Sequence, residues 1–275
     1  MIYAIRRLIF NLLKIIWVAI DRITNRECDI YNYYRKYFNT FGRLRKSYSF
    51  YFKSNKIYYD PVHNGSGYKM YFTGEPFEKE EINYLYDHVV NENSIILDIG
   101  ANIGIHSIIF STKATNGQVY SFEPSRNTFN IFTKNIENKK NIVPINLALS
   151  NEDGIADFYE FNTSALSSLI NTNRDKIKAI NKVICINGDS FIEKVLQLPK
   201  VDFIKIDVEG AEKLVLEGLE NTIEKFHPKI FCEIYKGTNS NPDPEGTINF
   251  LIEAGYKAFV FIDGKLKEYE SHNDK

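Results

Sequence analysis

The sequence predicts an α/β fold built on a largely parallel sheet, and three observations support this. Apolar runs of strand length alternate with segments of helical periodicity over most of the chain. A glycine-containing turn joins the run that ends at Asp98 to a helical segment beginning after Gly104. A second run ends at Glu123, where Pro124 stops the strand. Such features are typical of a doubly wound sheet that binds its ligand at the carboxyl ends of the strands.

Length and composition favour one main domain with an N-terminal extension. The chain has 275 residues, of which 44% are hydrophobic, and this is enough for one sizeable core. Residues 1–59 carry 12 Lys and Arg against 3 Asp and Glu, whereas the whole chain has a formal net charge of −1. We therefore divide the chain into a basic, aromatic-rich extension at 1–60 and an α/β domain at 61–275.

The extension begins with a predicted amphipathic helix at 2–23, which has a broad apolar face and a narrow polar stripe. Its uninterrupted apolar run at 15–20 is too short to span a bilayer, and it lacks the cleavage site of a signal peptide. The apolar face requires a cover, which is the chain's own domain, a second subunit of a homo-oligomer, or a membrane interface reached through residues 1–24. The sequence leaves these alternatives open.

Aromatic residues alternate with Lys and Arg between residues 30 and 59, without an acidic residue. This pattern suits single-stranded nucleic acid, anionic glycans or lipid headgroups, and no feature selects a specific nucleic acid. The plainest interpretation is a solvated helix with aromatic contacts to the core. A glycine-rich loop at 61–74 and a helix at 78–90 then lead to the first strand.

The stretch from 94 to 104 predicts a buried strand, a tight turn and the start of a helix. A dinucleotide site would place three glycines around a pyrophosphate, but the pattern D-x-G-x-N-x-G puts the carboxylate of Asp98 where a pyrophosphate would be repelled. It therefore favours a small, partly cationic ligand lying against the backbone at Gly100. The alternative is a turn that needs glycine for packing alone.

Glu123 follows the second strand, at 118–122, and lies 25 residues after Asp98. A carboxylate in this position can accept hydrogen bonds from both hydroxyls of a ribose. The alternative is a solvated acid at a strand end. Ser125 then opens a helix, and the third strand, at 142–147, contains Pro144, which confines that strand to the margin of the sheet.

A long insertion separates the third and fourth strands. It contains predicted strands at 155–161 and 183–186 with a polar turn at 164–168, and Asp189 is expected to cap the helix that follows. Long insertions near a site often serve as lids. This one either covers a ligand pocket or forms a solvent-facing hairpin.

Charged residues gather where the fourth and fifth strands end. Lys205, Asp207 and Glu209 are spaced by two around the end of the strand at 201–206, so they share one side of the sheet edge. Glu233 lies in the fifth strand, at 230–235, and faces the same crevice. The alternative for this group is a structural salt bridge. A helix at 244–254 and a hairpin that joins 256–262 to 265–269 through Asp263-Gly264 complete the domain.

Together these residues resemble the FkbM family of S-adenosylmethionine (SAM)-dependent methyltransferases over about residues 75–262. Four motifs carry the resemblance: Leu97-Asp-Ile-Gly-Ala-Asn-Ile-Gly104, Phe122-Glu-Pro124, Ile204-Lys-Ile-Asp-Val-Glu-Gly-Ala-Glu212 and Glu233. The resemblance implies a class I methyltransferase sheet of order 3-2-1-4-5-7-6 with an antiparallel seventh strand. It also implies SAM as cofactor and O-methylation, often of sugar or polyketide hydroxyls.

By this resemblance two sets of residues form the site. SAM would be held by Asp98, Gly100, Ala101, Asn102, Gly104, Glu123 and Asp207. The reaction centre would be lined by Lys205, Asp207, Glu209 and Glu233.

Other methyltransferase chemistries fit these positions less well. Base N-methylation usually accompanies an Asn/Asp-Pro-Pro-aromatic turn, which is replaced here by Asp207-Val-Glu-Gly. Cytosine C5 chemistry needs an exposed nucleophilic cysteine, whereas Cys232 lies in mid-strand. We therefore expect O-methylation of a small molecule or glycan, with a sugar of a surface polysaccharide or glycolipid favoured. The alternatives are a SAM-binding or membrane-attached scaffold without catalysis, and a methyltransferase acting on RNA or protein.

Two mechanisms remain at the reaction centre. Glu209 acts as a metal-free general base, or Asp207 and Glu233 share a divalent cation that polarises the acceptor hydroxyl. The first is favoured because no His or Asn beside Glu233 offers a further ligand. The cysteines, including Cys28 and Cys185, lack the spacing of a metal site or a disulfide framework, so a cytoplasmic location is expected, with peripheral contact to the inner face of the membrane as an addition.

Overall fold

The structure is a computed structural model of the chain, and it describes residues 12, 15, 16, 48–59, 76, 78–161, 164–173, 175–234, 241–262 and 265–269. The chain divides into two compact units, residues 1–77 and 78–275, and each is described by itself.

The first unit contains an antiparallel hairpin of β1 (Tyr48–Phe52) and β2 (Asn55–Tyr59). Phe52, Ile57 and Tyr59 are buried. The solvated helix expected at 30–59 is therefore wrong for this segment. Along β2 the buried residues Ile57 and Tyr59 lie two apart, which is the period of a strand. The rest of that stretch and the loop at 61–74 lie outside the described residues.

The helix predicted at 2–23 also lies outside the described residues, apart from three positions. Leu12, Ile15 and Ile16 are helical and exposed. Among the described residues, no helix has the length and apolar character needed to cross a membrane.

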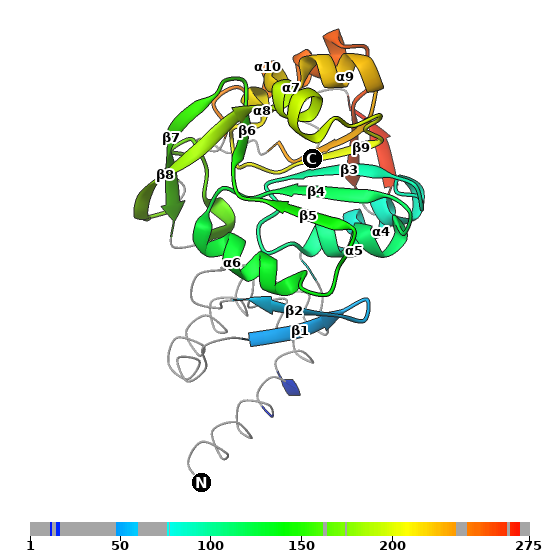
Figure 1. Ribbon diagram of the computed structural model, residues 1–275, viewed down its shortest axis with the longest axis vertical. Coiled ribbons are helices and arrows are strands. Elements are labelled where there is room, and N and C mark those ends of the chain that lie inside the picture. The colour runs from blue at the N-terminus through cyan, green and yellow to red at the C-terminus, as the bar shows by residue number, and fades with distance from the viewer. Residues whose placement is uncertain are drawn as a thin grey trace. The chain divides into compact units, whose positions relative to one another are not determined.

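The second unit is an α/β domain around a five-stranded parallel sheet, as the sequence predicts (Figure 1). The strands lie in the order β10 (Lys229–Cys232), β9 (Phe203–Ile206), β3 (Ile95–Ile99), β4 (Gln118–Phe122) and β5 (Ile142–Ile145). This is the expected order 3-2-1-4-5, read from the opposite side. The strand containing Pro144 lies at the margin, where it pairs with β4 alone.

Helices cover both faces of the sheet (Figure 1). One face carries α4 (Lys79–His88), α5 (Ile105–Lys113) and α6 (Arg126–Asn135), the last of which is capped by the Ser125 side chain as predicted. The other face carries α8 (Glu212–Gly218), α9 (Glu220–Phe226) and α10 (Pro244–Glu253).

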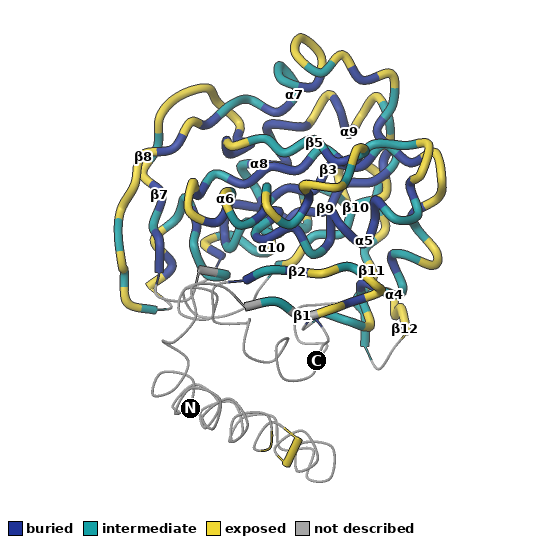
Figure 2. The backbone as a smooth tube through the Cα atoms, turned by 60° about the horizontal axis from the view of Figure 1, so that its bottom comes forward, coloured by how far each residue is buried: buried dark blue, intermediate teal, exposed yellow. Residues whose placement is uncertain are grey.

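The core lies between the sheet and these helices, and Figure 2 shows buried backbone along the central strands. Strand residues such as Leu97, Phe122 and Ile204 pack with Val215 of α8 and Ile223 of α9 in one apolar cluster. This packing fixes the carboxyl ends of β3, β4 and β9 relative to one another.

The insertion forms a sheet of its own. β6 (Ala148–Ser150), β8 (Ile177–Asn187) and β7 (Gly154–Phe161) pair in that order, and the short helical turn η2 (Ser164–Leu166) follows β7. The predicted cap is corrected here. The side chain of Asn187 caps α7 (Gly188–Ser190), which continues into η3 (Phe191–Leu196), whereas Asp189 accepts hydrogen bonds from the backbone at Asn221 and Thr222 in α9.

The closing hairpin is present but differs from the expected arrangement. β11 (Phe259–Ile262) and β12 (Lys265–Glu268) pair antiparallel with each other, and their turn, Asp263-Gly264, lies outside the described residues. In the described part of the chain neither strand joins the central sheet, so the seven-strand order 3-2-1-4-5-7-6 is not observed. An apolar pocket lined by residues of β10, α10 and β11 lies at this edge.

Candidate active site

The loop between β3 and α5 is held close to the ends of the neighbouring strands. The backbone N–H groups of Gly100 and Ala101 donate to the carbonyl oxygen of Phe122, at 3.0 and 2.9 Å. Gly100 has a φ of +78°, and a Cβ on it would lie 1.8 Å from the carbonyl oxygen of Asp207. Glycine is therefore required here by the approach of the β9 end, which is a packing role in addition to the predicted ligand contact.

Gly104 has a second packing role in the same loop. Its φ is +88°, and a Cβ on it would lie 2.3 Å from the ring of Phe132 in α6. The absence of a side chain at Gly104 leaves room for the Phe132 ring of α6 where α5 begins.

Asp98 lies at the carboxyl end of β3, but its side chain is completely buried. It accepts a hydrogen bond from the hydroxyl of Ser107, which in turn lies 2.9 Å from the hydroxyl of Ser121. Its other carboxylate oxygen lies 3.5 Å from Nζ of Lys205. This carboxylate is therefore enclosed by protein groups.

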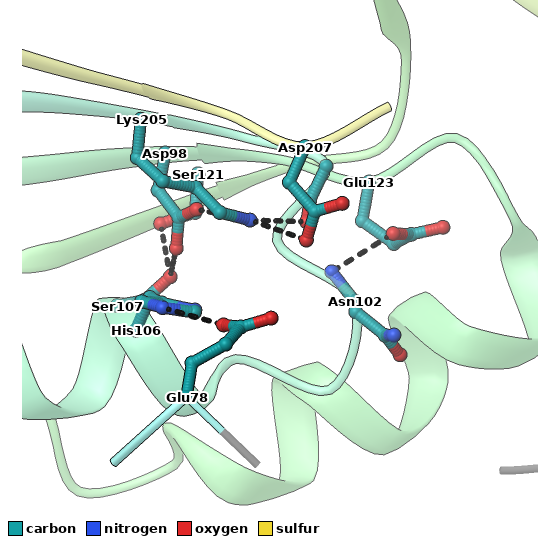
Figure 3. A network of polar contacts seen from close by, with 10 residues as sticks. Glu78, Asp98, Asn102, His106, Ser107, Ser121, Glu123, Lys205 and Asp207 are labelled. Atoms are coloured by element: carbon teal, nitrogen blue, oxygen red, sulfur yellow. Dashed lines mark hydrogen bonds and ion pairs between the residues drawn. The ribbon is translucent and has the colours of Figure 1, made fainter. Parts of the chain in front are cut away.

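Lys205 links three elements at the sheet edge, although it is only 1% exposed. Its Nζ donates to the carbonyl oxygen of Gly100 at 3.0 Å and to the carboxylate of Asp207 at 3.1 Å (Figure 3). Burial opposes its charge, but Asp207 and Asp98 more than offset that and raise the pKa of Lys205. The structural salt bridge considered for Lys205 is thus present, and it positions Asp207.

Glu123 lies at the end of β4 and is 6% exposed. Its carboxylate accepts hydrogen bonds from the backbone of Asn102 at 2.9 Å and of Ser125 at 2.8 Å. Burial nevertheless raises its pKa to about 7. Glu123 therefore contacts the loop between β3 and α5 through Asn102, whereas the carboxylate of Asp98 faces Ser107 and Lys205.

A pocket lies in front of this loop. Its lining includes Gly100, Asn102, Glu123, Asp207 and Glu209. The insertion supplies part of the wall through Phe158, Ala165, Ser167 and Leu169. The hydroxyl of Ser168 donates to the carbonyl oxygen of Val208 at 2.9 Å, and that of Ser125 donates to Glu160 at 2.8 Å. The insertion thus borders the same pocket as Glu123.

The segment after β9 is held in an uncommon conformation. Glu209 has a φ of +55° and Gly210 a φ of +106°. Glu212, at the start of α8, accepts from the backbone of Gly210 at 2.8 Å and also from the side chain of Asn241. Burial raises the pKa of Glu212 to about 7. Glu212 therefore fixes the segment that carries Glu209, a role that sequence reasoning did not assign to it.

Two further residues at the site, His106 and Glu78, were missed in the sequence. His106, in the first turn of α5, has its Nε2 3.2 Å from a carboxylate oxygen of Glu78, at the start of α4. Glu233 follows β10 directly and interacts with Glu78. Desolvation of its carboxyl group and the charges of Asp207 and Glu78 raise the pKa of Glu233, although the residue as a whole remains exposed. No sequence signal joins Glu78 to the site, because its position depends on how α4 packs on α5.

Comparisons with known proteins relate this chain to methyltransferases. A family model described as "Methyltransferase FkbM domain" matches residues 98–258. The chain is 29% identical over 200 residues to the hexuronic acid methyltransferase AglP of Haloferax volcanii, covering 69% of this chain and 78% of the relative. It is 27% identical over 149 residues to Methyltransferase 1 of Beauveria bassiana, covering 47% of this chain and 60% of that protein.

Solved structures of methyltransferases also match at low sequence identity. Fibrillarin of Aeropyrum pernix, with natively bound SAM, is 16% identical with a TM-score of 0.42, and the match covers 80% of this chain and 79% of that one. A putative rRNA methylase of Clostridium thermocellum is 14% identical with a TM-score of 0.42, covering 66% and 82% of the respective chains.

Proposed function

Because this chain belongs to the FkbM family of SAM-dependent methyltransferases, we propose that it transfers a methyl group from SAM to a hydroxyl group of a carbohydrate. The observation that carries this proposal is the pocket that Glu123, Asp207 and Glu209 share at the carboxyl ends of β4 and β9. A buried acid suited to a ribose and two carboxylates suited to an acceptor hydroxyl line one cavity.

The residues of this pocket fit SAM. Glu123 is buried and has a raised pKa, so its carboxylate gains from any hydroxyl donor that enters the pocket, and the ribose of SAM offers two. Asn102 and Gly100 line the same wall. We assign SAM binding to Gly100, Asn102 and Glu123, with Ala101 and Gly104 shaping the loop.

In the proposed mechanism Glu209 removes the acceptor proton. When bound, SAM supplies an electrophilic methyl group on its sulfonium. An alcohol is a poor nucleophile unless its proton is removed during attack, so a carboxylate is needed beside the acceptor oxygen. Asp207 and Glu209 both line the pocket, and Glu209 lies on the turn after β9. Glu212 holds that turn and so orients the base.

The proposed acceptor class has separate support. The name of the Haloferax volcanii relative identifies a sugar acid as that protein's substrate. In this chain, Asp207 and Glu209 place carboxylates on the acceptor side of the pocket. A neutral sugar hydroxyl is compatible with that charge.

The test of the base compares Glu209→Gln with Glu224→Gln, an exposed change on α9 away from the site. We expect Glu209→Gln to lower turnover by roughly 100-fold or more while SAM affinity stays unchanged, since general-base contributions are typically of that size. Glu224→Gln should behave as the unmodified protein does. A Glu209→Gln protein with normal turnover would remove this residue from the mechanism.

The metal-free form of the mechanism has its own test. Among the described residues, no cluster of three or more His, Cys, Asp or Glu side chains has the arrangement of a metal site. We expect EDTA to leave turnover unchanged. Activity lost in EDTA and restored by magnesium would instead assign Asp207 and Glu233 to a shared divalent cation.

For residues 1–24 we propose peripheral contact with an anionic membrane surface. The support is the sequence pattern of apolar face and basic charge. Flotation with anionic liposomes should require this segment and should weaken as salt rises. If the protein instead dimerised through this segment, and the dimerisation did not change with salt, a homo-oligomer contact would be favoured.

A further inference from the structure

The starting point is the carboxylate of Asp98, which the family resemblance assigns to SAM binding. In the structure this side chain is 0% exposed, and its two oxygens face Ser107 and Lys205. Lys205 is itself bonded to Gly100 and Asp207. A ligand could reach Asp98 only by displacing the Lys205 and Ser107 side chains that enclose it. Asp98 is therefore better suited to hold Lys205 than to bind a positively charged ligand.

Another carboxylate does face the space in front of the loop. The side chain of Glu78 is 33% exposed, and Figure 3 shows it across from Asp207, with the Asn102 loop beside it. One of its oxygens contacts His106, and the other is directed away from His106. Although burial would raise its pKa, the neighbouring His106 and Lys205 lower the pKa of Glu78 to about 2, so it is ionised.

The charges around this space favour a cation. Three carboxylates, Glu78, Asp98 and Asp207, lie around one lysine, Lys205, and one histidine, His106. Glu233 also interacts with Glu78, but desolvation and the charges of Asp207 and Glu78 raise its pKa to about 9, so it adds little negative charge. Three carboxylates against two basic groups leave negative charge in excess. A positively charged group that enters the space between Glu78 and Asp207 is stabilised electrostatically, whereas an anion is not.

We propose that Glu78, supported by His106, binds the α-ammonium group of SAM in place of Asp98. This inference rests on the proposed function, because it takes SAM to be the ligand of the pocket. Asp98 then has a positioning role: it fixes Lys205, which in turn fixes Asp207. The segment before the family-matched region thereby contributes a binding residue that the motif at 98–104 does not contain.

Calorimetric titration of the full-length protein with two probes tests this assignment. SAM carries the ammonium group, whereas 5′-methylthioadenosine keeps the adenosine and lacks the amino-acid portion. The variants are Glu78→Gln and, as the matched control, Glu80→Gln, which changes an exposed acid on the same helix.

We expect Glu78→Gln to weaken SAM binding by roughly tenfold to a hundredfold, as loss of a charge-assisted hydrogen bond does. Its affinity for methylthioadenosine should stay within about twofold of the unmodified protein, and Glu80→Gln should change neither. Equal weakening for both probes would show a merely structural role and overturn the proposal, as would unchanged SAM binding in Glu78→Gln.

The outcome separates this proposal from the proposed function. If the unmodified protein binds neither probe, the SAM pocket itself is wrong. If it binds both and Glu78→Gln has no selective effect on SAM, the pocket stands and Glu78 is not its ammonium ligand.

Discussion

At the scale of single residues, the site depends on one buried cation. Lys205 forms ion pairs with two carboxylates, Asp98 in the interior and Asp207 at the edge, and within the described part of the chain it is the cation that both of them share. A buried charge that loses its partner is strongly destabilising, whereas an exposed ion pair contributes little. Stability and site geometry therefore depend on the same side chain.

We predict that Lys205→Met lowers the free energy of unfolding by about 3 to 5 kcal/mol. Lys182→Met is the control, because its pair with Asp157 is exposed and should contribute less than about 1 kcal/mol. Urea unfolding followed by circular dichroism measures both. Adding Asp98→Asn to Lys205→Met should recover part of the lost free energy of unfolding. If Lys205→Met and Lys182→Met both had similarly small effects, the structural role of the Lys205 ion pairs would be contradicted.

Two buried acids predict how stability depends on pH. Burial raises the pKa values of Glu123 and Glu212 from 4.5 to about 7. Between these values the folded protein binds more protons than the unfolded chain, so the contribution of each residue to the free energy of unfolding falls as pH rises from about 4.5 to 7. Glu78, whose pKa is lowered, acts in the opposite direction, but only below about pH 4.5.

We expect Glu212→Gln to lose less stability than the unmodified protein between pH 4.5 and 7.5, because one of the acids with a raised pKa is gone while Glu123 and Glu233 remain. Urea unfolding at the two pH values, with Glu224→Gln as a control, measures the difference. A loss in Glu212→Gln equal to that of the unmodified protein would rule out this residue as a source of the pH dependence.

The sequence predicts part of the site at this scale. The spacing of two between Lys205 and Asp207 correctly places them together, and Glu123 at the end of β4 lies against the loop that follows β3. It does not predict that Asp98 is enclosed, because this depends on Ser107, a residue of the following helix. The contact of His106 with Glu78 depends on helix packing, for which local sequence has no signal.

At the scale of elements, the loop between β3 and α5 is constrained by neighbouring backbone. The carbonyl oxygen of Asp207 occupies the position that a side chain at residue 100 would need. The chain avoids the conflict with a glycine in the left-handed region. Close contact between this loop and the β9 end is what gathers Asn102, Asp207 and Glu123 around one pocket.

Gly100→Ala should therefore lower the free energy of unfolding by more than about 2 kcal/mol, through steric overlap as well as an unfavourable φ. Alanine substitutions at two other glycines distinguish the steric overlap from the cost of the unfavourable φ. Gly255→Ala adds the φ cost alone, because a Cβ there meets nothing within 4 Å at a φ of +86°, and Gly154→Ala adds neither. Thermal or urea unfolding should show the largest loss of stability for Gly100→Ala, a smaller loss for Gly255→Ala and the smallest for Gly154→Ala. If Gly100→Ala were as stable as Gly154→Ala, the packing argument would be contradicted.

Periodicity and proline chemistry predict most elements of the domain correctly, including the marginal position of the strand with Pro144. Two elements differ for tertiary reasons. Asp189 reaches across to α9 because Asn187 already caps α7. The closing hairpin pairs with itself while an apolar pocket lies between it and β10, and no local pattern specifies how a hairpin packs against a sheet edge.

At the scale of the whole molecule, the chain combines a methyltransferase domain with a basic N-terminal unit. The two compact units meet at residues 77 and 78, so Glu78 is the first residue of the unit that carries the site. The boundary predicted near residue 60 was drawn from composition and charge. Composition and charge describe the surface of a segment. They carry little information on which of its residues line a pocket formed mainly by other parts of the chain.

The account's central claim is that the pocket at the ends of β3, β4 and β9 binds SAM through Glu123, and calorimetric titration tests it most directly. We predict that the protein binds one SAM, that NAD does not bind, and that Glu123→Ala weakens SAM binding by about 1.5 to 3 kcal/mol, the size of a lost charge-assisted hydrogen bond. Binding of NAD without SAM, or a Glu123→Ala protein with unchanged affinity for SAM, would contradict the claim.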